Sequence, residues 1–229
     1  MDIYSQKGPA LAQKLTLTFM ELLLIAFSAW IMFGAGENFI AHIFGFQPAA
    51  ALPMRRWIIF AFNVIVLLRM AFMMFVLMKR TIPWSEALSV PFAFAIYYVG
   101  YALLVLPSRA ELGALDYFAI ALFVFGSYLN TGGELGRYFF KRDPANKGKL
   151  YTTGLFSYAM HINFFGDILW VSAYALITQN WWSVPIPIAI AAMFAFANVP
   201  MLDKHLAQHY GAQFSAYAAR TKKLVPFIW

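Results

Sequence analysis

GLFSYAMHINFFGDILW, residues 154–170, sets His161, Asn163 and Asp167 into the mouth of an otherwise apolar segment. A polar side chain is costly in such surroundings unless it pairs with or binds something. Asn163 and Asp167 are four residues apart, so they share one face of a helix. The stretch therefore predicts an apolar helix that begins with a binding site.

The rest of the chain is equally apolar. Of its 229 residues, 62% are hydrophobic and 12% charged, and the mean hydropathy is +0.66. This leaves too little polar surface to coat a soluble globule, so the chain must lie in a bilayer. It contains no Cys, which excludes thiolate chemistry, Cys-ligated zinc and iron–sulfur clusters. Redox chemistry would need a borrowed cofactor.

Six stretches are apolar over the roughly 20 residues that a helix needs to cross the hydrocarbon core. They lie near residues 15–35, 57–78, 87–107, 114–138, 155–178 and 184–201. Residues 202–220 are amphipathic instead, with Leu206, Tyr210, Phe214 and Tyr217 on one helical stripe. We therefore predict an all-α fold in one domain, residues 1–229: a polytopic membrane helix bundle of about six transmembrane helices plus a C-terminal cytoplasmic amphipathic helix.

The basic residues predict the orientation. Those on the side of the two chain ends are Lys7, Lys14, Lys79, Arg80, Arg137, Lys141, Arg142, Lys147, Lys149, Lys204, Arg220, Lys222 and Lys223. Only Arg55, Arg56 and Arg109 fall opposite, where Arg55 and Arg56 are interpreted as solvated loop charges together with Glu37 and His42. Because cytoplasmic loops retain positive charge, both termini are predicted to be cytoplasmic, in a bacterial inner membrane or its equivalent. This bias also accounts for the net charge of +7 without a nucleic-acid partner.

Another row of polar residues lies earlier in the sequence than His161, Asn163 and Asp167. Asn130, Glu134, Arg137 and Lys141 follow one another at i, i+4, i+7 and i+11, which is one stripe of a helix. An amide and an acid at depth, with cations nearer the water, suit a dinucleotide whose phosphates point outward. The ordinary alternative is that the cations are snorkelling anchors and that Glu134 pairs with Arg137. No metal site is expected, because the histidines and scattered carboxylates lack a ligand spacing.

These rows, together with residues 203–229, resemble the membrane-embedded lipid reductases: steroid 5α-reductases, sterol C14-reductases and their DUF1295-like relatives. The resemblance covers a little under half of the chain, from about Leu129 onward. It implies an oxidoreductase of CH–CH bonds that uses NADPH to reduce a C=C bond in a steroid-like or other lipid. It also implies a cofactor-binding set: Asn130, Glu134, Arg137, Lys141, Lys149, His161, Asn163, Asp167, Asp203, His205 and Tyr210.

Such a reduction also needs an acid. The resemblance makes residues 1–113 the half that forms the lipid cavity and residues 114–229 the half that binds the cofactor. Steroid 5α-reductases use a Glu and a Tyr from early spans, and the candidates here are Glu21, Tyr98 and Tyr101. Glu21 is the first choice, because an acid among apolar neighbours is a candidate proton donor. Its alternative is a structural ion pair with Arg69.

Two other functions fit these residues. The isoprenylcysteine carboxyl methyltransferases and phospholipid methyltransferases form a sister family that uses S-adenosylmethionine, with an Arg-His-Pro-x-Tyr-x-Gly block and two adjacent acids. Here Met160-His161-Ile162-Asn163 lacks the Arg and the Pro, and Asp203 stands alone, which favours a reductase. A non-catalytic lipid-binding protein is the third possibility, but it would not need Asn130, Glu134, Asn163 and Asp167 together.

Overall fold

The computed structural model describes residues 8, 10–48 and 53–229, and over these residues it is helical without a β-strand. Five helical segments are long and apolar enough to cross a membrane: Leu11–Phe33, Met54–Leu77, Trp84–Val105, Ala114–Arg142 and Trp181–Tyr210. A shorter apolar helix spans Ile162–Thr178. The predicted fold class is confirmed, and the protein is an integral membrane protein. Lys7, used above for the orientation, lies outside the described residues.

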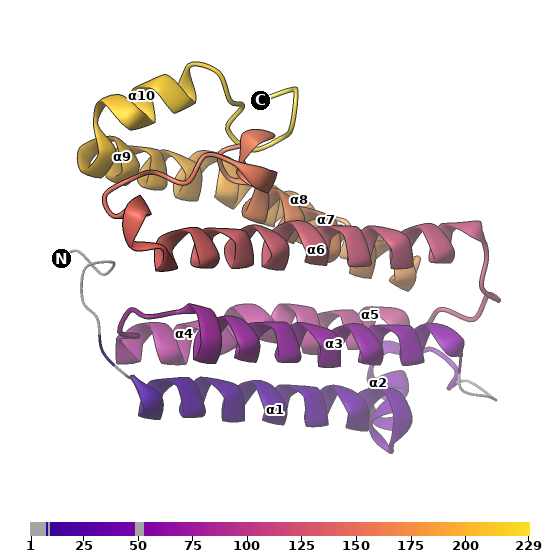
Figure 1. Cartoon of the computed structure of the whole chain (residues 1–229). Coiled ribbons are helices and arrows are strands. Elements are labelled where there is room, and N and C mark those ends of the chain that lie inside the picture. Colours follow the sequence, from indigo (N-terminus) through magenta and orange to yellow (C-terminus); the bar gives the residue numbers. More distant parts are fainter. Residues whose placement is uncertain (1–7, 9, 49–52) are drawn as a thin grey trace. The chain divides into compact units, whose positions relative to one another are not determined.

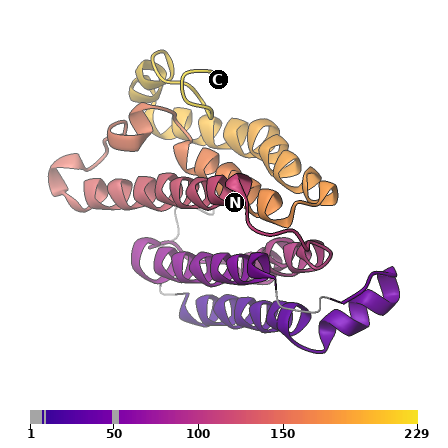
Figure 2. The same ribbon diagram turned by 90° about the vertical axis from the view of Figure 1, so that its right-hand side faces the viewer.

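The chain forms two compact units, of which unit 1 comprises residues 1–119 and 174–183. Its helices are α1 (Leu11–Phe33), α2 (Gly36–Phe44), α3 (Met54–Phe72), α4 (Trp84–Ala95) and α5 (Tyr101–Val105). α1 packs against α3 and α4, and the three run alongside one another in Figures 1 and 2. One side of each helix is packed, as at Leu17 and Ile59, while Phe19 and Leu68 stay exposed. Such apolar exposed faces are suited to lipid.

Unit 2 comprises residues 120–173 and 184–229. It holds most of α6 (Ala114–Arg142) and α7 (Ile162–Thr178), together with α8 (Pro185–Met193), α9 (Val199–Tyr210) and α10 (Ala212–Ala218). Short 3₁₀ turns span η3 (Pro144–Asn146) and η4 (Gly154–Ser157) in this unit, and a third, η5 (Trp181–Ser183), belongs to unit 1. α9 ends at Gly211, whose φ of 50° ends the helix as glycine commonly does. The predicted apolar stripe is confirmed across this break, because Leu206, Tyr210, Phe214 and Tyr217 pack into one cluster with Met160.

Three membrane helices contain a π-helical turn: η1 (Met73–Leu77), η2 (Ile96–Gly100) and η6 (Phe194–Asn198). The last of these corrects a sequence expectation. The sixth span was predicted to give way to a separate amphipathic helix just after Pro200, yet α8, η6 and α9 form one continuous run, drawn in orange in Figure 2. Proline lacks an N–H and clashes with the carbonyl four residues earlier, and a π-turn just before it relieves both problems.

The start of α7 also differs from the prediction. A helix was expected from residue 155, but residues 154–157 form η4 and the regular helix begins at Ile162. The intervening backbone is bound to the C-terminal segment, because Met160 N donates to Lys222 O at 2.7 Å and His161 N donates to Lys223 O at 2.9 Å. The Tyr217 hydroxyl donates to Phe156 O at 2.5 Å, and burial raises the pKa of this phenol. These bonds place His161 at the first turn of α7.

Candidate functional site

Two glycines bring α6 and α7 into contact. A Cβ atom on Gly126 would lie 2.6 Å from Gly166 O, and one on Gly166 would lie 2.6 Å from Gly126 O. Any side chain at either position would force the helices apart, so only glycine allows this close backbone approach. Asn130 follows Gly126 by one turn and Asp167 follows Gly166 directly. The crossing therefore sets the spacing of the polar side chains beside it.

Those side chains form a hydrogen-bonded group. The buried Asn130 donates from Nδ2 to Asp167 Oδ1 at 2.8 Å and, more weakly, to Asn163 O at 3.4 Å. Trp170 donates from Nε1 to the same Asp167 oxygen at 2.7 Å. Charge-assisted bonds of this kind hold a carboxylate in a fixed orientation. Sequence reasoning placed Asn130 and Asp167 in the site but did not identify the Trp170 indole as a partner.

The group extends one turn along α6 to Glu134. Asn163 donates from Nδ2 to Glu134 Oε1 at 3.0 Å, and Arg137 Nη2 donates to both oxygens of the same carboxylate. The Glu134 side chain is 15% exposed and that of Arg137 is 45% exposed, so the group grades from interior to solvent. The Glu134–Arg137 pair is the one that the ordinary alternative predicted. We call Asn130, Glu134, Arg137, Asn163 and Asp167 the α6–α7 polar cluster.

Further cations lie at the end of α6. Lys141 Nζ donates to the Tyr210 hydroxyl at 2.6 Å and to Lys149 O at 3.0 Å, and it lies 5.0 Å from the centroid of the Tyr210 ring. Three residues from α6, the following loop and α9 are thus brought together. All three were predicted as cofactor contacts on the resemblance, and Lys141 also on its place in the polar row of α6.

His161 and Asp203 form a second pair in unit 2. His161 Nε2 lies 2.8 Å from Asp203 Oδ1, and Lys223 Nζ lies 3.5 Å from the other Asp203 oxygen. The His161 ring stacks on Phe164 with centroids 5.7 Å apart. On α9, the His205 ring stacks on the His209 ring one turn later, with the two ring centroids 6.2 Å apart. An imidazole held by a carboxylate is a common arrangement for accepting or relaying a proton.

Unit 1 holds the predicted acid. Glu21, Tyr98 and Tyr101 are all fully buried. Both Glu21 carboxylate oxygens and the Tyr98 hydroxyl lack a hydrogen-bond partner within the described part of the chain. Glu21 therefore accepts no hydrogen bond from Arg69, and the alternative of a structural ion pair between the two residues stays a prediction. Buried polar atoms without a partner are rare in folded proteins, and they occur preferentially at functional sites.

A polar chain in the same unit was not predicted from the sequence. Tyr174 donates from its hydroxyl to Asn63 Oδ1 at 3.0 Å, and Asn63 Nδ2 donates to Ser28 Oγ at 3.2 Å and to Tyr98 O at 3.4 Å. The Tyr98 carbonyl belongs to η2, where the wider helical turn accommodates an outside donor. Asn63 was detectable by the rule that selected Glu21, because it is an amide inside an apolar span.

Arg55 and Arg56 are not solvated loop charges, as the sequence analysis assumed. Both are buried in unit 1. Arg55 binds Asp116 through two bonds, Nε to Oδ1 at 2.8 Å and Nη2 to Oδ2 at 2.7 Å, while Arg56 binds both Glu37 oxygens at 2.6 Å. Arg55 also donates to the Ala110 and Glu111 carbonyls. These arginines cap helix ends and close a loop, so their role is structural.

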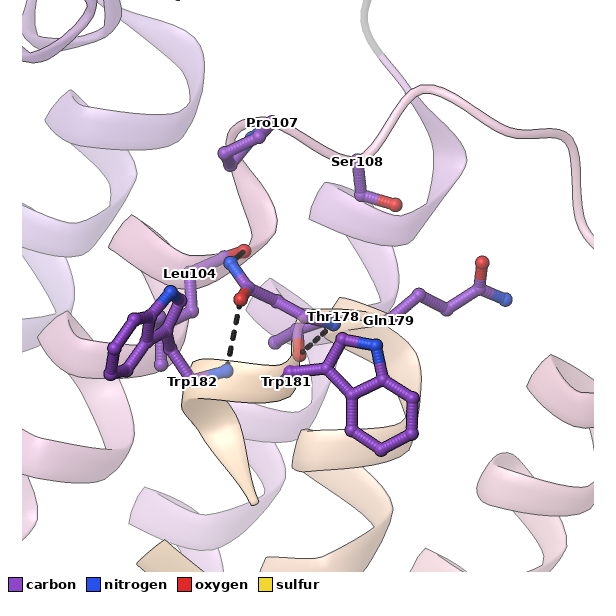
Figure 3. A pocket seen from close by; sticks show the side chains of 8 residues that line it. Leu104, Pro107, Ser108, Thr178, Gln179, Trp181 and Trp182 are labelled. Carbon is purple, nitrogen blue, oxygen red and sulfur yellow. Dashed lines mark hydrogen bonds between the residues drawn. The ribbon is translucent and has the colours of Figure 1, made fainter. Parts of the chain in front are cut away.

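A hollow of about 260 Å³ lies beside the loop between α5 and α6, and Figure 3 shows the side chains that line it. Its rim carries Trp181 and Trp182, which are 87% and 81% exposed. The polar groups below are internally bonded, since Asn180 accepts from Trp182 N and donates to Leu104 O, while Thr178 donates to Ala175 O. The hollow is the outside of a capped turn, and its indoles are suited to a membrane–water interface.

The fold and the two polar regions define an integral membrane protein with partly buried ionisable groups inside its helical core. Residues 26–221 match the family described as "Protein of unknown function (DUF1295)", and the chain belongs to that family. Over 86 residues it is 37% identical to a protein of Ustilaginoidea virens described as "Probable O-methyltransferase ustE". That match covers 37% of this chain and 30% of the fungal protein.

Proposed function

We propose that this protein is an NADPH-dependent membrane reductase that saturates a C=C bond in a steroid-like or other lipid. The observation that carries the proposal is the α6–α7 polar cluster, which grades from the buried amide of Asn130 to the exposed guanidinium of Arg137 and continues to Lys141. Buried amides and an acid can hold an uncharged carboxamide, and arginine and lysine can hold phosphates. The donor set therefore suits a dinucleotide.

A bound NADPH supplies a hydride. In the reduction, the C=C π bond breaks, one new C–H bond forms from that hydride and another forms from a proton of the protein. Glu21 is the proposed proton donor, and Tyr98 is proposed to donate a hydrogen bond to a carbonyl conjugated with the double bond. Tyr101, also buried, is assigned to shaping the lipid site. Burial without a hydrogen-bond partner leaves the Glu21 and Tyr98 groups available to a ligand.

The cofactor assignment is tested by melting the purified full-length protein in detergent with NADPH, NADH or S-adenosylmethionine. A ligand at about 100 times its Kd stabilises the folded state by about 2.7 kcal/mol. We expect NADPH to give this shift in the wild type and in Arg109→Gln, an exposed cation of unit 1. Arg137→Gln and Asn163→Ala should lose it while still melting cooperatively. An unchanged NADPH shift in both variants would remove the polar cluster from the cofactor site.

The acid is tested separately by mass spectrometry of a 3-oxo-4-ene steroid incubated with NADPH. Glu21→Gln should lower the yield of the dihydro product, in which the C=C bond has gained two hydrogen atoms. The melting shift that NADPH causes should stay intact. Wild-type yield in this variant would exclude Glu21 as the donor.

A second candidate is a membrane methyltransferase that uses S-adenosylmethionine, and the fungal relative favours it. The His161–Asp203 pair would then serve as the base that removes the proton of the hydroxyl to be methylated. Stabilisation by S-adenosylmethionine and not by NADPH would establish this candidate in place of the reductase. Stabilisation by neither would favour a non-catalytic lipid-binding protein.

A further inference from the structure

Unit 2 carries a groove of about 640 Å³ on the outer surface of α6. Gly132, Leu135 and Phe139 of α6 form one wall, and Tyr151, Leu155 and Tyr158 form the other. We call it the tyrosine groove. Phe139 and Tyr158 are more than half exposed, so the groove is open to the surroundings of the protein.

The tyrosine groove is separate from the α6–α7 polar cluster. At 100° per residue, Asn130, Glu134 and Arg137 lie within about 60° of one another around the axis of α6. Gly132, Leu135 and Phe139 lie on the opposite side, about 140–200° away from Asn130 by the same geometry. The two sides of one helix thus present different chemistry, and a ligand in the groove would not compete with a cofactor at the cluster.

The walls of the groove suit a hydrocarbon chain with a polar end. Gly132 keeps the floor of the groove low, because a Cβ there would have ordinary contacts at 3.4 Å, whereas a Cβ on Gly136 or Gly154 would lie 2.8 or 2.7 Å from the Tyr151 hydroxyl. That hydroxyl is therefore wedged against the backbone inside an apolar channel. Tyrosines are typical of the membrane–water interface, where an acyl chain meets its headgroup.

Two exposed cations adjoin residues that line the groove. Arg142 follows Phe139 by one turn of α6, is exposed, and lies with its guanidinium 5.6 Å from the Tyr138 ring. Arg220 donates to Thr152 Oγ1 at 3.4 Å, next to Tyr151. Basic side chains beside an interfacial apolar channel complement a negatively charged headgroup.

We infer that the tyrosine groove binds one anionic phospholipid, with an acyl chain along Gly132, Leu135 and Phe139 and its phosphate near Arg142 and Arg220. The apolar channel and the two cations each select for part of that molecule. A zwitterionic phospholipid offers the same chain but a headgroup that these cations do not favour.

The test is native mass spectrometry of the full-length protein, first in lipid-free detergent and then titrated with phosphatidylglycerol or phosphatidylcholine. We expect one phosphatidylglycerol bound in preference to phosphatidylcholine. Arg142→Gln should weaken phosphatidylglycerol binding about fivefold and leave phosphatidylcholine unchanged, because one interfacial cation is removed. Gly132→Leu should weaken both lipids roughly tenfold, because its side chain takes the room of about two methylenes.

Two controls keep the outcome interpretable. Arg109→Gln removes an exposed cation elsewhere, and Gly113→Leu places the same side chain where a Cβ meets nothing within 4 Å. Both should bind phosphatidylglycerol as the wild type does. Equal affinity for the two lipids, or unchanged binding in both groove variants, would overturn the inference. Because Arg142→Gln alters only an exposed side chain, it decides the matter even if Gly132→Leu fails to fold.

Discussion

At the scale of single residues, the buried Arg55–Asp116 pair contrasts with a pair that is open to solvent in part. Arg55 and Asp116 share two bonds away from solvent, whereas the paired side chains of Arg80 and Glu86 are 22% and 27% exposed. Removing one partner of a buried pair leaves the other charge without compensation, which costs about 3–5 kcal/mol. An exposed pair contributes about 0–1 kcal/mol.

We therefore expect Asp116→Asn to lower the free energy of unfolding far more than Glu86→Gln does. Thermal melting of both variants in one detergent measures the difference. Similar small losses in the two variants would mean that water or detergent compensates Arg55, and the structural role assigned to it would be wrong.

For Glu21 we predict the opposite effect, a gain in stability when the residue is replaced. A buried carboxyl group without a hydrogen-bond partner destabilises the fold, by about 1–3 kcal/mol. Glu21→Leu keeps a similar volume and removes the polar group, so this variant should melt at a higher temperature than the wild type while losing the proposed reductase activity. Substitutions of active-site residues typically raise stability and lower activity. A lower melting temperature would show that Glu21 has a stabilising partner.

At the scale of elements, the contact between α6 and α7 depends on Gly126 and Gly166. Gly166→Ala puts a Cβ atom 2.6 Å from a carbonyl oxygen, and the helices must separate to accept it. Overpacking of this kind costs about 1–3 kcal/mol. Gly132→Ala is the matched control in α6, because its Cβ would meet neighbours only at 3.4 Å.

The expected result is a marked loss of stability in Gly166→Ala and little change in Gly132→Ala, measured by thermal melting. Loss of the NADPH shift in Gly166→Ala would follow, since the crossing spaces Asn130 from Asp167. Equal melting temperatures for the two variants would show that α6 and α7 separate at little cost.

The sequence predicted where the membrane helices lie better than it predicted where they end and which residues they bring into contact. Hydropathy located the five long apolar helices of the described residues and the shorter α7, because burial in lipid demands an apolar run, and helical spacing placed Asn130 with Glu134 and Asn163 with Asp167. It did not reveal that Asn163 bonds to Glu134 across two helices. That bond depends on the Gly126–Gly166 crossing, and glycines in an apolar helix have several uses. The helix through Pro200 was missed because a π-turn has no simple sequence signal.

At the scale of the whole molecule, the absence of cysteine offers a direct test of orientation. Ala110 and Ala145 are exposed, in the loops before and after α6, and a cysteine at either position changes no charge. If the positive-inside rule holds, a membrane-impermeant maleimide added to intact cells should label Ala110→Cys. Ala145→Cys should be labelled only after the membrane is permeabilised. The reverse pattern would place the chain ends outside.

The two units also differ in what their interiors contain. Unit 1 buries an acid, an amide and several tyrosines, whereas the polar groups of unit 2 grade outward to the cations of α6 and α9. The functional halves predicted from the sequence, residues 1–113 and 114–229, stay a prediction, and cofactor-dependent hydrogen exchange would test them. NADPH is expected to slow exchange in residues 126–141 and 161–170.

The glycine crossing has a consequence for motion during turnover. The carbonyl oxygens of Gly126 and Gly166 lie against the opposing backbone. The two helices therefore cannot separate near Asn130 without losing this close contact. If the proposed cofactor binds, its access would then come past the outer segments, such as α9, which is held by the Lys141–Tyr210 and His161–Asp203 contacts. Those two contacts, and not the helical crossing beneath them, would accordingly have to give way.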